Sequence, residues 1–162
     1  MGKEAGISAG RVIRNAITER GIANIILATG TSQFETLNQL IADEGIDWSN
    51  VVMFHLDEYI GLPITHPASF RKYLKERFLT KVPPLKAAFL IDGETDANSE
   101  CERLGKLISK HPIDVALVGI GENGHLALMI LLRTLILRSR TSSSISMISV
   151  FSNNSVKDGF HR

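Results

Sequence analysis

The sequence has few of the features that identify a protein class directly. Cys101 is the single cysteine among 162 residues, which excludes a disulfide within the chain and fits a reducing compartment. A net charge of +1 gives no electrostatic reason to expect nucleic acid or an anionic membrane as a partner. The opening residues, M-G-K-E-A-G, contain no apolar segment of a secretory signal. The most apolar stretch, 126–137, is too short to span a bilayer. We expect a soluble cytoplasmic protein.

Recognisable metal and nucleotide motifs are also missing. His55, His66, His111 and His125 are scattered and show none of the usual Cys/His ligand spacings, so no metal site is predicted. The turn at 29–32, T-G-T-S, lacks the additional glycines that a Walker loop or a dinucleotide-binding fingerprint needs.

The chain does contain apolar runs that alternate with amphipathic segments. Hydrophobic residues make up 44% and charged residues 22%, which is ordinary for a globular chain, and this length favours one domain. Strands are expected at 24–28, 51–56, 87–91 and 113–118; helices are expected at 4–20, from Phe34 to near Gly45, at 69–78 and at 96–110. This spacing predicts an α/β fold, a parallel sheet covered by helices on both faces.

The stretch 115–127, V-A-L-V-G-I-G-E-N-G-H-L-A, is an apolar strand followed by a glycine-rich loop. Open α/β sheets bind ligands at the carboxyl ends of their strands, and glycine lets the backbone come close to a ligand. Histidine is the side chain best matched to proton transfer near neutral pH, and a polar neighbour can fix its tautomer. We therefore take His125, with Asn123 and Glu122 beside it, as a candidate catalytic group; a structural histidine is the alternative.

Gly30, Thr31 and Ser32 form a second candidate at the end of the first expected strand. Free backbone N–H groups and hydroxyls at the start of a helix favour an anion, and the helix dipole adds to this preference. A capped turn with no ligand is the alternative.

Two adjacent acids, Asp57 and Glu58, follow the strand at 51–56. Buried carboxylates without partners are costly, so they need a partner or a task. One of them could abstract a proton next to a carbonyl group while the structure holds the other, and both are candidate catalytic residues. A solvated loop with helix-capping acids is the alternative. His55 is expected to pack rather than to bind a ligand.

Two segments together resemble the glucosamine-6-phosphate deaminase family, which shares a superfamily with the 6-phosphogluconolactonases. They are M-F-H-L-D-E-Y-I-G-L-P-I-T-H-P-A-S-F-R-K-Y-L at 53–74 and G-I-G-E-N-G-H-L-A at 119–127. The family pattern D-E-Y-x-G-L-x-x-x-H-P-x-S-(Y/F) is present in full. Lactonases usually have D-E-R, so Tyr59 favours the deaminases. The resemblance covers 1–127 and implies a Rossmann-like parallel sheet.

By this resemblance, the reaction is aldose–ketose isomerisation with loss of ammonia, which converts glucosamine 6-phosphate to fructose 6-phosphate without a cofactor. Asp57 matches the general base that moves a proton between C2 and C1. His125 matches the histidine that opens the sugar ring, and 30–32 match the phosphate loop. Asn123 stands where the family has a supporting Asp. An amide cannot stabilise a charged histidine as a carboxylate does, so slower ring opening or an altered substrate is expected.

The resemblance ends at Ala127, where the family continues with F-N-(E/D)-P and this chain reads L-M-I-L-L. The codons TTT AAT GAT CCT CCT encode F-N-D-P-P, and the loss of one T leaves TTA ATG ATC CTC CT, which encodes L-M-I-L-L. Residues 128–157 also contain no Asp or Glu. We therefore hypothesise that 128–162 is an out-of-frame tail that packs poorly or forms a makeshift helix. The sheet would be incomplete, with one edge uncovered, and the chain would have little or no deaminase activity.

Three other interpretations remain. The first is hydrolysis of a phosphosugar lactone, which Tyr59 disfavours. The second is a non-catalytic binder of sugar phosphates, suggested by Asn123 and by the missing acid after Ala127. The third is a fragment without function. The deaminase, the lactonase and the non-catalytic binder all have a phosphosugar as the ligand. Assembly as a homo-oligomer is also possible.

Overall fold

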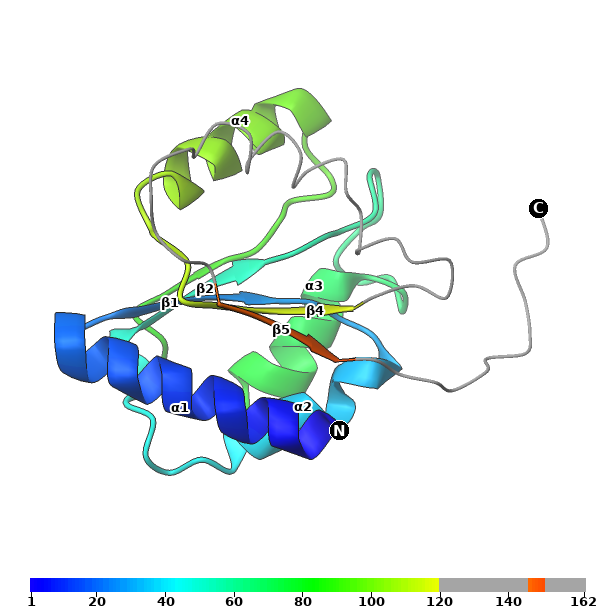
Figure 1. The fold of residues 1–162 in the computed structure, drawn as a ribbon. Coiled ribbons are helices and arrows are strands. Elements are labelled where there is room, and N and C mark those ends of the chain that lie inside the picture. Colours follow the sequence, from blue (N-terminus) through cyan, green and yellow to red (C-terminus); the bar gives the residue numbers. More distant parts are fainter. Residues whose placement is uncertain (120–145, 151–162) are drawn as a thin grey trace.

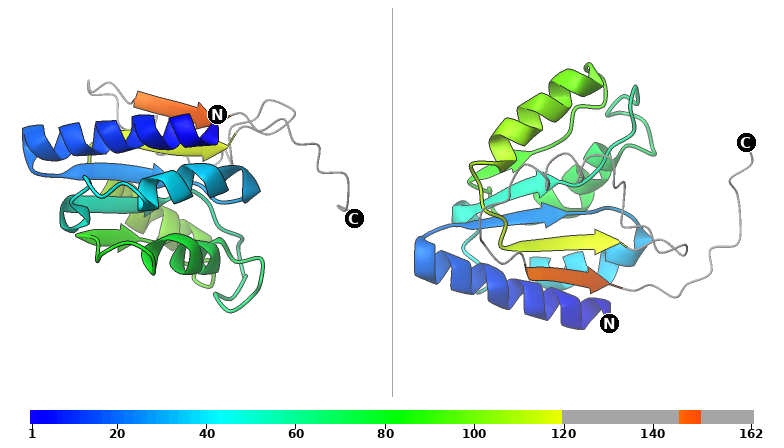
Figure 2. Two further views of the ribbon diagram at one scale, coloured as in Figure 1. Left: turned by 90° about the horizontal axis from the view of Figure 1, so that it is seen from below. Right: turned by 45° about the horizontal axis from the view of Figure 1, so that its top comes forward.

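The computed structural model describes residues 1–119 and the backbone of residues 146–150 (Figure 1). Within these residues, five parallel strands form one sheet in the order β3-β2-β1-β4-β5, and Figure 2 shows them side by side. The strands are β1 (Ala23–Leu27), β2 (Val51–His55), β3 (Ala87–Phe89), β4 (Val115–Gly119) and β5 (Ser146–Val150). Every residue of β1 and β2 is buried, as expected for strands with both faces covered. The predicted parallel α/β sheet is confirmed.

Helices cover both faces of the sheet, as the sequence predicted. One face carries α1 (Gly2–Arg20), α2 (Phe34–Ile41) and α3 (Phe70–Leu74), and α4 (Ala97–Ile108) lies over the other (Figure 1). Two short 3₁₀ helices, η1 (Thr31–Gln33) and η2 (Trp48–Asn50), lead into α2 and β2. No helix among the described residues is long and apolar enough to cross a membrane.

Each face of the sheet has its own apolar core. The larger core joins Ile13 of α1 and Leu40 of α2 to strand side chains such as Met53 and Leu117. The smaller core contains alternate strand residues, among them Ile26, Val52, Phe54 and Val118, with Leu107 of α4 packed against them. This division follows from the period of two along a strand, which sends successive side chains to opposite faces.

Several helix ends follow the local signals in the sequence. Gly21 ends α1 in the left-handed conformation, with φ 73°, and donates its N–H to Ile17 at 2.8 Å. The Ser69 and Asp96 side chains accept backbone N–H groups at the starts of α3 and α4. The predicted starts of both helices are therefore confirmed.

The helix expected at 69–78 is divided in two. After Leu74 the chain widens into a π-helix, η3 (Lys75–Leu79), closed by a 3.1 Å hydrogen bond from the Thr80 N–H to the Lys75 carbonyl, five residues earlier. Phe78 is fully buried within this wider turn and packs edge-on against Trp48, with ring centroids 5.4 Å apart. The apolar pattern predicted the buried face but not the change of helical period.

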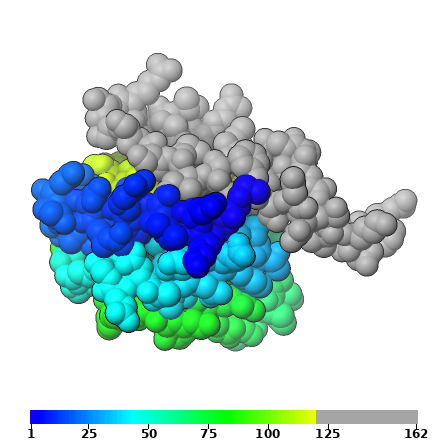
Figure 3. All heavy atoms as spheres, turned by 60° about the horizontal axis from the view of Figure 1, so that its bottom comes forward, coloured from blue at the N-terminus to red at the C-terminus, as the bar shows by residue number. Residues whose placement is uncertain are grey.

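The helices α1 and α2 pack unusually closely. Gly2, Gly6 and Gly10 line the contact, and a Cβ added at Gly6 would lie 2.6 Å from the Cβ of Gln39. The Thr36 hydroxyl donates to the Gly2 carbonyl at 3.1 Å across this contact. Figure 3 shows this side of the molecule, with the dark blue atoms of α1 lying against the lighter blue region that contains α2.

Residues 146–150 of the tail form a strand. Poor packing or a makeshift helix was predicted for the tail, and the helix is wrong for these residues, which form β5, paired in parallel with β4 from Val115 opposite Ser146 to Gly119 opposite Val150. The pairing uses backbone N–H and C=O groups, which any sequence supplies, and S-M-I-S-V has the β-branched residues that strands favour. The other residues of the tail lie outside the described part of the chain.

Candidate functional site

Three polar segments lie at the carboxyl edge of the sheet. The Leu56 N–H donates to Leu27 at 3.1 Å and the Ala28 N–H donates to Leu117 at 3.0 Å, so the pairing of β1, β2 and β4 extends to the start of each following loop. The strand order reverses between β1 and β4, and open α/β sheets bind ligands at such a switch point. The turn after β1, the acids after β2 and the end of β4 therefore converge, as predicted.

The turn after β1 is held in an extended glycine conformation. Gly30 has φ 105°, which other residues rarely adopt, and no heavy atom of the described residues lies within 4 Å of the position that its Cβ would take. Its carbonyl accepts the Gln33 N–H at 3.1 Å and the Tyr73 hydroxyl at 2.9 Å. Thr31 is exposed and Ser32 is half-buried. Thr31 and Ser32 thus begin η1 directly after the turn at the carboxyl end of β1.

Asp57 is a buried acid with an unoccupied oxygen. Its side chain is 6% exposed, and Oδ1 has no hydrogen-bond partner in the described part of the chain. Burial and the neighbouring charge of Glu58 raise the pKa of Asp57 to about 6. A carboxylate with a pKa near the working pH and a free oxygen can act as a general base.

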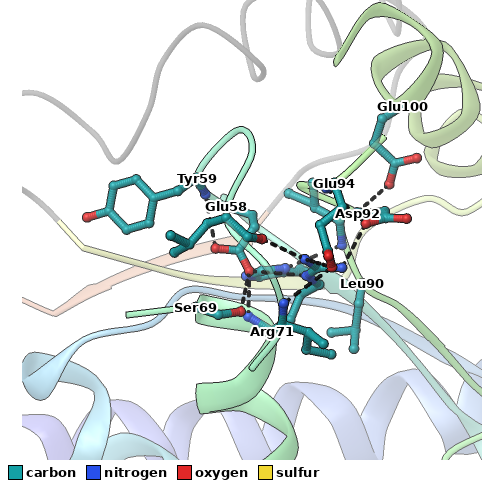
Figure 4. A network of polar contacts seen from close by, with 12 residues as sticks. Glu58, Tyr59, Ser69, Arg71, Leu90, Asp92, Glu94 and Glu100 are labelled. Carbon is teal, nitrogen blue, oxygen red and sulfur yellow. Dashed lines mark hydrogen bonds and ion pairs between the residues drawn. The ribbon is translucent and has the colours of Figure 1, made fainter. Parts of the chain in front are cut away.

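Glu58 has different surroundings, although it is the next residue. Both of its oxygens accept hydrogen bonds, from the backbone N–H groups of Tyr59, Phe70 and Arg71 and from the Ser69 hydroxyl (Figure 4). Burial alone would raise its pKa, but these donors outweigh burial and lower it. Of the two carboxylates predicted as catalytic, Glu58 is the one that the structure holds.

The other carboxylates around this loop meet at Arg71. Its guanidinium is 8% exposed and lies 2.7 Å from Asp92 and 2.9 Å from Glu94, while also donating to the Leu62 carbonyl at 2.9 Å (Figure 4). Arg71 was not predicted as a site residue. The signal that could have found it is the pair of acids at the end of β2. Burying two adjacent carboxylates costs free energy, and a nearby cation can offset that cost.

His55 packs in the interior, as expected. It is 5% exposed, and its Nδ1 accepts the Ile91 N–H at 3.4 Å. Burial lowers its pKa to about 4, so the ring is neutral at pH 7. No group of three or more His, Cys, Asp or Glu side chains within the described residues is placed to hold a metal ion.

Gln33 is a second polar group that the sequence analysis missed. It is fully buried, and neither amide atom has a hydrogen-bond partner in the described part of the chain. Its Nε2 would lie 4.0 Å from a Cβ added at Gly119, which places Gln33 beside the end of β4. Glu122, Asn123 and His125 lie outside the described residues, so their predicted roles stay predictions.

The fold and the site define a class first: a doubly wound parallel α/β protein with a glycine turn and a buried acid at its switch point. Within that class, the chain belongs to the family described as Glucosamine-6-phosphate isomerases/6-phosphogluconolactonase, whose model matches residues 3–131. The resemblance proposed from the sequence is therefore confirmed.

Similar proteins include members of both branches of this family. A glucosamine-6-phosphate deaminase of Listeria monocytogenes serotype 4a (strain HCC23) is 40% identical over 116 residues, which are 71% of this chain and 49% of the relative. A solved monomeric glucosamine-6-phosphate deaminase has a TM-score of 0.68 and 32% identity, and the match covers 78% of this chain and 55% of that one.

A 6-phosphogluconolactonase of Thermotoga maritima has a TM-score of 0.69 at 20% identity, over 80% of this chain and 60% of that one, which is a likeness of fold alone. The chain spans about half the length of the curated relatives it matches.

Proposed function

We propose that this chain carries part of the active site of an amino-sugar phosphate deaminase. Such an enzyme isomerises glucosamine 6-phosphate to fructose 6-phosphate and releases ammonia. The observation that carries the proposal is Asp57, a buried carboxylate with a pKa of about 6 whose Oδ1 has no hydrogen-bond partner among the described residues, at the same sheet edge as the Gly30 turn. The identity to deaminases supports the choice of substrate.

In this proposal each part of the site has one task. Thr31 and Ser32 offer hydroxyls and backbone N–H groups to the phosphate. Asp57 takes the proton from C2 of the open-chain sugar and returns it at C1, a transfer for which a pKa near neutrality is suitable. His125 opens the ring, and Asn123 orients the histidine. No cofactor is needed for these steps.

We further propose that the segment 128–162 is out of frame and that the chain as written has little or no turnover. The break in the family pattern at L-M-I-L-L and the half-length match to the relatives support this proposal. A cytoplasmic location also remains a proposal, supported by the free thiol of Cys101.

Ammonia release from glucosamine 6-phosphate tests the function. The purified chain and a version with the frame restored after Ala127 are assayed together, and turnover is expected only in the restored version. Turnover of the written chain near that of a complete relative would refute the tail proposal. Absence of turnover in both would refute the deaminase assignment. Acid production from 6-phosphogluconolactone by the restored version would favour the lactonase, and calorimetric binding without turnover would favour a binder.

Re-reading the DNA around the Ala127 codon tests the tail directly. The frame-shift hypothesis expects one additional T in an independent read. An unbroken frame in repeated reads would contradict it.

A further inference from the structure

The loop that follows β2 is anchored on both sides of Asp57. Before it, the Leu56 N–H donates to the Leu27 carbonyl of the neighbouring strand at 3.1 Å. After it, Glu58 accepts the Phe70 N–H at 3.1 Å and the Arg71 N–H at 2.8 Å, so its carboxylate occupies the first turn of α3. Those N–H groups have no partners within the helix itself, and an anion at this position is stabilised by them. The backbone of Asp57 is thus held by its two neighbours.

Arg71 extends this anchor to a third segment. Its guanidinium joins the loop after β2, through the Leu62 carbonyl, to Asp92 and Glu94 in the segment after β3. The two segments also touch backbone to backbone, since the Gly61 N–H donates to the Gly93 carbonyl at 2.6 Å. A side chain at Gly93 would clash with the Tyr59 carbonyl, so the contact depends on glycine there.

We propose that Glu58 and Arg71 are positioning residues that close this loop over Asp57, so that Asp57 alone transfers the proton while Glu58 never exchanges one with substrate. The assignment of Asp57 as base rests on the proposed function. The closure itself rests on the hydrogen bonds and ion pairs of Figure 4.

Closure has a measurable effect on Asp57. Among the described residues, the charged groups that contact the loop are Glu58 within it, Arg71 from α3, and Asp92 and Glu94 after β3, while His55 precedes it in neutral form. Burial is the main cause of the raised pKa of Asp57, and the Glu58 charge is the second. A loop that opens admits water and lowers the pKa of Asp57 even when every charge is retained.

The test is a ¹³C NMR titration of the Asp57 carboxyl carbon in the full chain, assigned with Asp57→Asn. Glu58→Gln places an NH₂ group against the donors and also removes a charge that itself raises the pKa of Asp57. The pKa of Asp57 is expected to fall by about one unit or more, in part from the lost charge alone, so the variants that keep the charge of Glu58 isolate the effect of closure. Arg71→Lys keeps the charge but loses the three-way contact, and a fall of about half a unit is expected. Hydrogen exchange at the Phe70 amide is expected to accelerate about tenfold in both variants.

A matched control separates closure from general loss of stability. Arg14 pairs with Asp43 on the helical face, so Arg14→Lys weakens a partly buried ion pair outside the loop and is expected to leave the Asp57 titration unchanged. Ser69→Ala removes one donor to Glu58 without changing any charge, and it serves where the other variants fail to fold; a smaller fall is expected.

Unchanged Asp57 titration in the folded variants, or an equal shift in Arg14→Lys, would overturn the proposal. None of these measurements uses turnover, so an absence of deaminase activity would count against the proposed function alone.

Discussion

His55 and Asp57 lie two residues apart at the end of β2, and burial shifts their pKa values in opposite directions, so that their order is reversed. The pKa of His55 falls from its ordinary 6.5 to about 4, and the pKa of Asp57 rises from 3.8 to about 6. Both groups are therefore neutral over much of the range between pH 4 and 6. Their pH dependences oppose each other, because between pH 4 and 6 His55 takes up a proton on unfolding whereas Asp57 releases one.

Asp57→Asn is expected to stabilise the protein at pH 7 by up to about 3 kcal/mol. A folded pKa raised to about 6 means that the contribution of Asp57 is present below pH 3.8 and is lost as the pH rises through 6. Asparagine carries no charge at either pH, so the variant does not lose stability as the pH rises. Urea unfolding of both proteins at pH 7 and pH 4 measures the difference in the free energy of unfolding. An equal change at both values of pH would show that the pKa of Asp57 is not raised.

His55→Asn is expected to have the opposite pH signature. With a folded pKa lowered to about 4, the contribution of His55 is present above pH 6.5 and is lost as the pH falls toward 4. The variant lacks this loss, so relative to the native chain it gains about 3 kcal/mol between pH 6.5 and pH 4. The asparagine Oδ1 can still accept the Ile91 N–H that the ring nitrogen accepts. A pH-independent difference from the native chain would contradict the prediction.

Gly6→Ala is expected to destabilise the fold by about 1–3 kcal/mol, although alanine is the better helix former. The added Cβ would lie 2.6 Å from Gln39 and 2.8 Å from the Thr36 carbonyl, which is backbone and cannot move aside cheaply. Asn15→Ala, at an exposed position of the same helix, is the control. It is expected to stabilise the fold by roughly a few tenths of a kcal/mol. Equal effects in thermal unfolding would mean that α1 and α2 are not in close contact.

Tyr73→Phe is expected to weaken phosphate binding about fivefold while leaving the fold intact. Its hydroxyl donates to the Gly30 carbonyl at 2.9 Å, and burial raises the pKa of Tyr73 to about 12, so it remains a donor throughout the working range. Losing one such bond costs about 1 kcal/mol. Titration with inorganic phosphate, followed by ³¹P NMR, gives the affinity. Unchanged affinity would show that phosphate binding does not depend on the hydrogen bond between Tyr73 and the Gly30 turn.

The sequence predicted the elements whose signals are local. Apolar runs located β1, β2 and β4, Gly21 ended α1, and Ser69 capped α3, because these features depend on residues within a few positions of one another. The pairing of β5 with β4 could not be predicted in this way, since any strand-compatible segment can supply the backbone partners. Gln33 was also missed, because the burial of a polar side chain depends on the elements that cover it.

By itself, the sequence determined the parallel α/β architecture, the family and the acids at the end of β2. The family resemblance matched Asp57 to the base, but only the tertiary structure shows the physical difference between the two acids. Glu58 is held in its ionised form by donors 11 to 13 residues further along the chain, whereas Asp57 is buried and its Oδ1 has no hydrogen-bond partner among the described residues. Two adjacent carboxylates are equivalent in a sequence. The N–H groups and the burial that make them different come from α3 and from the sheet edge, which only folding brings together.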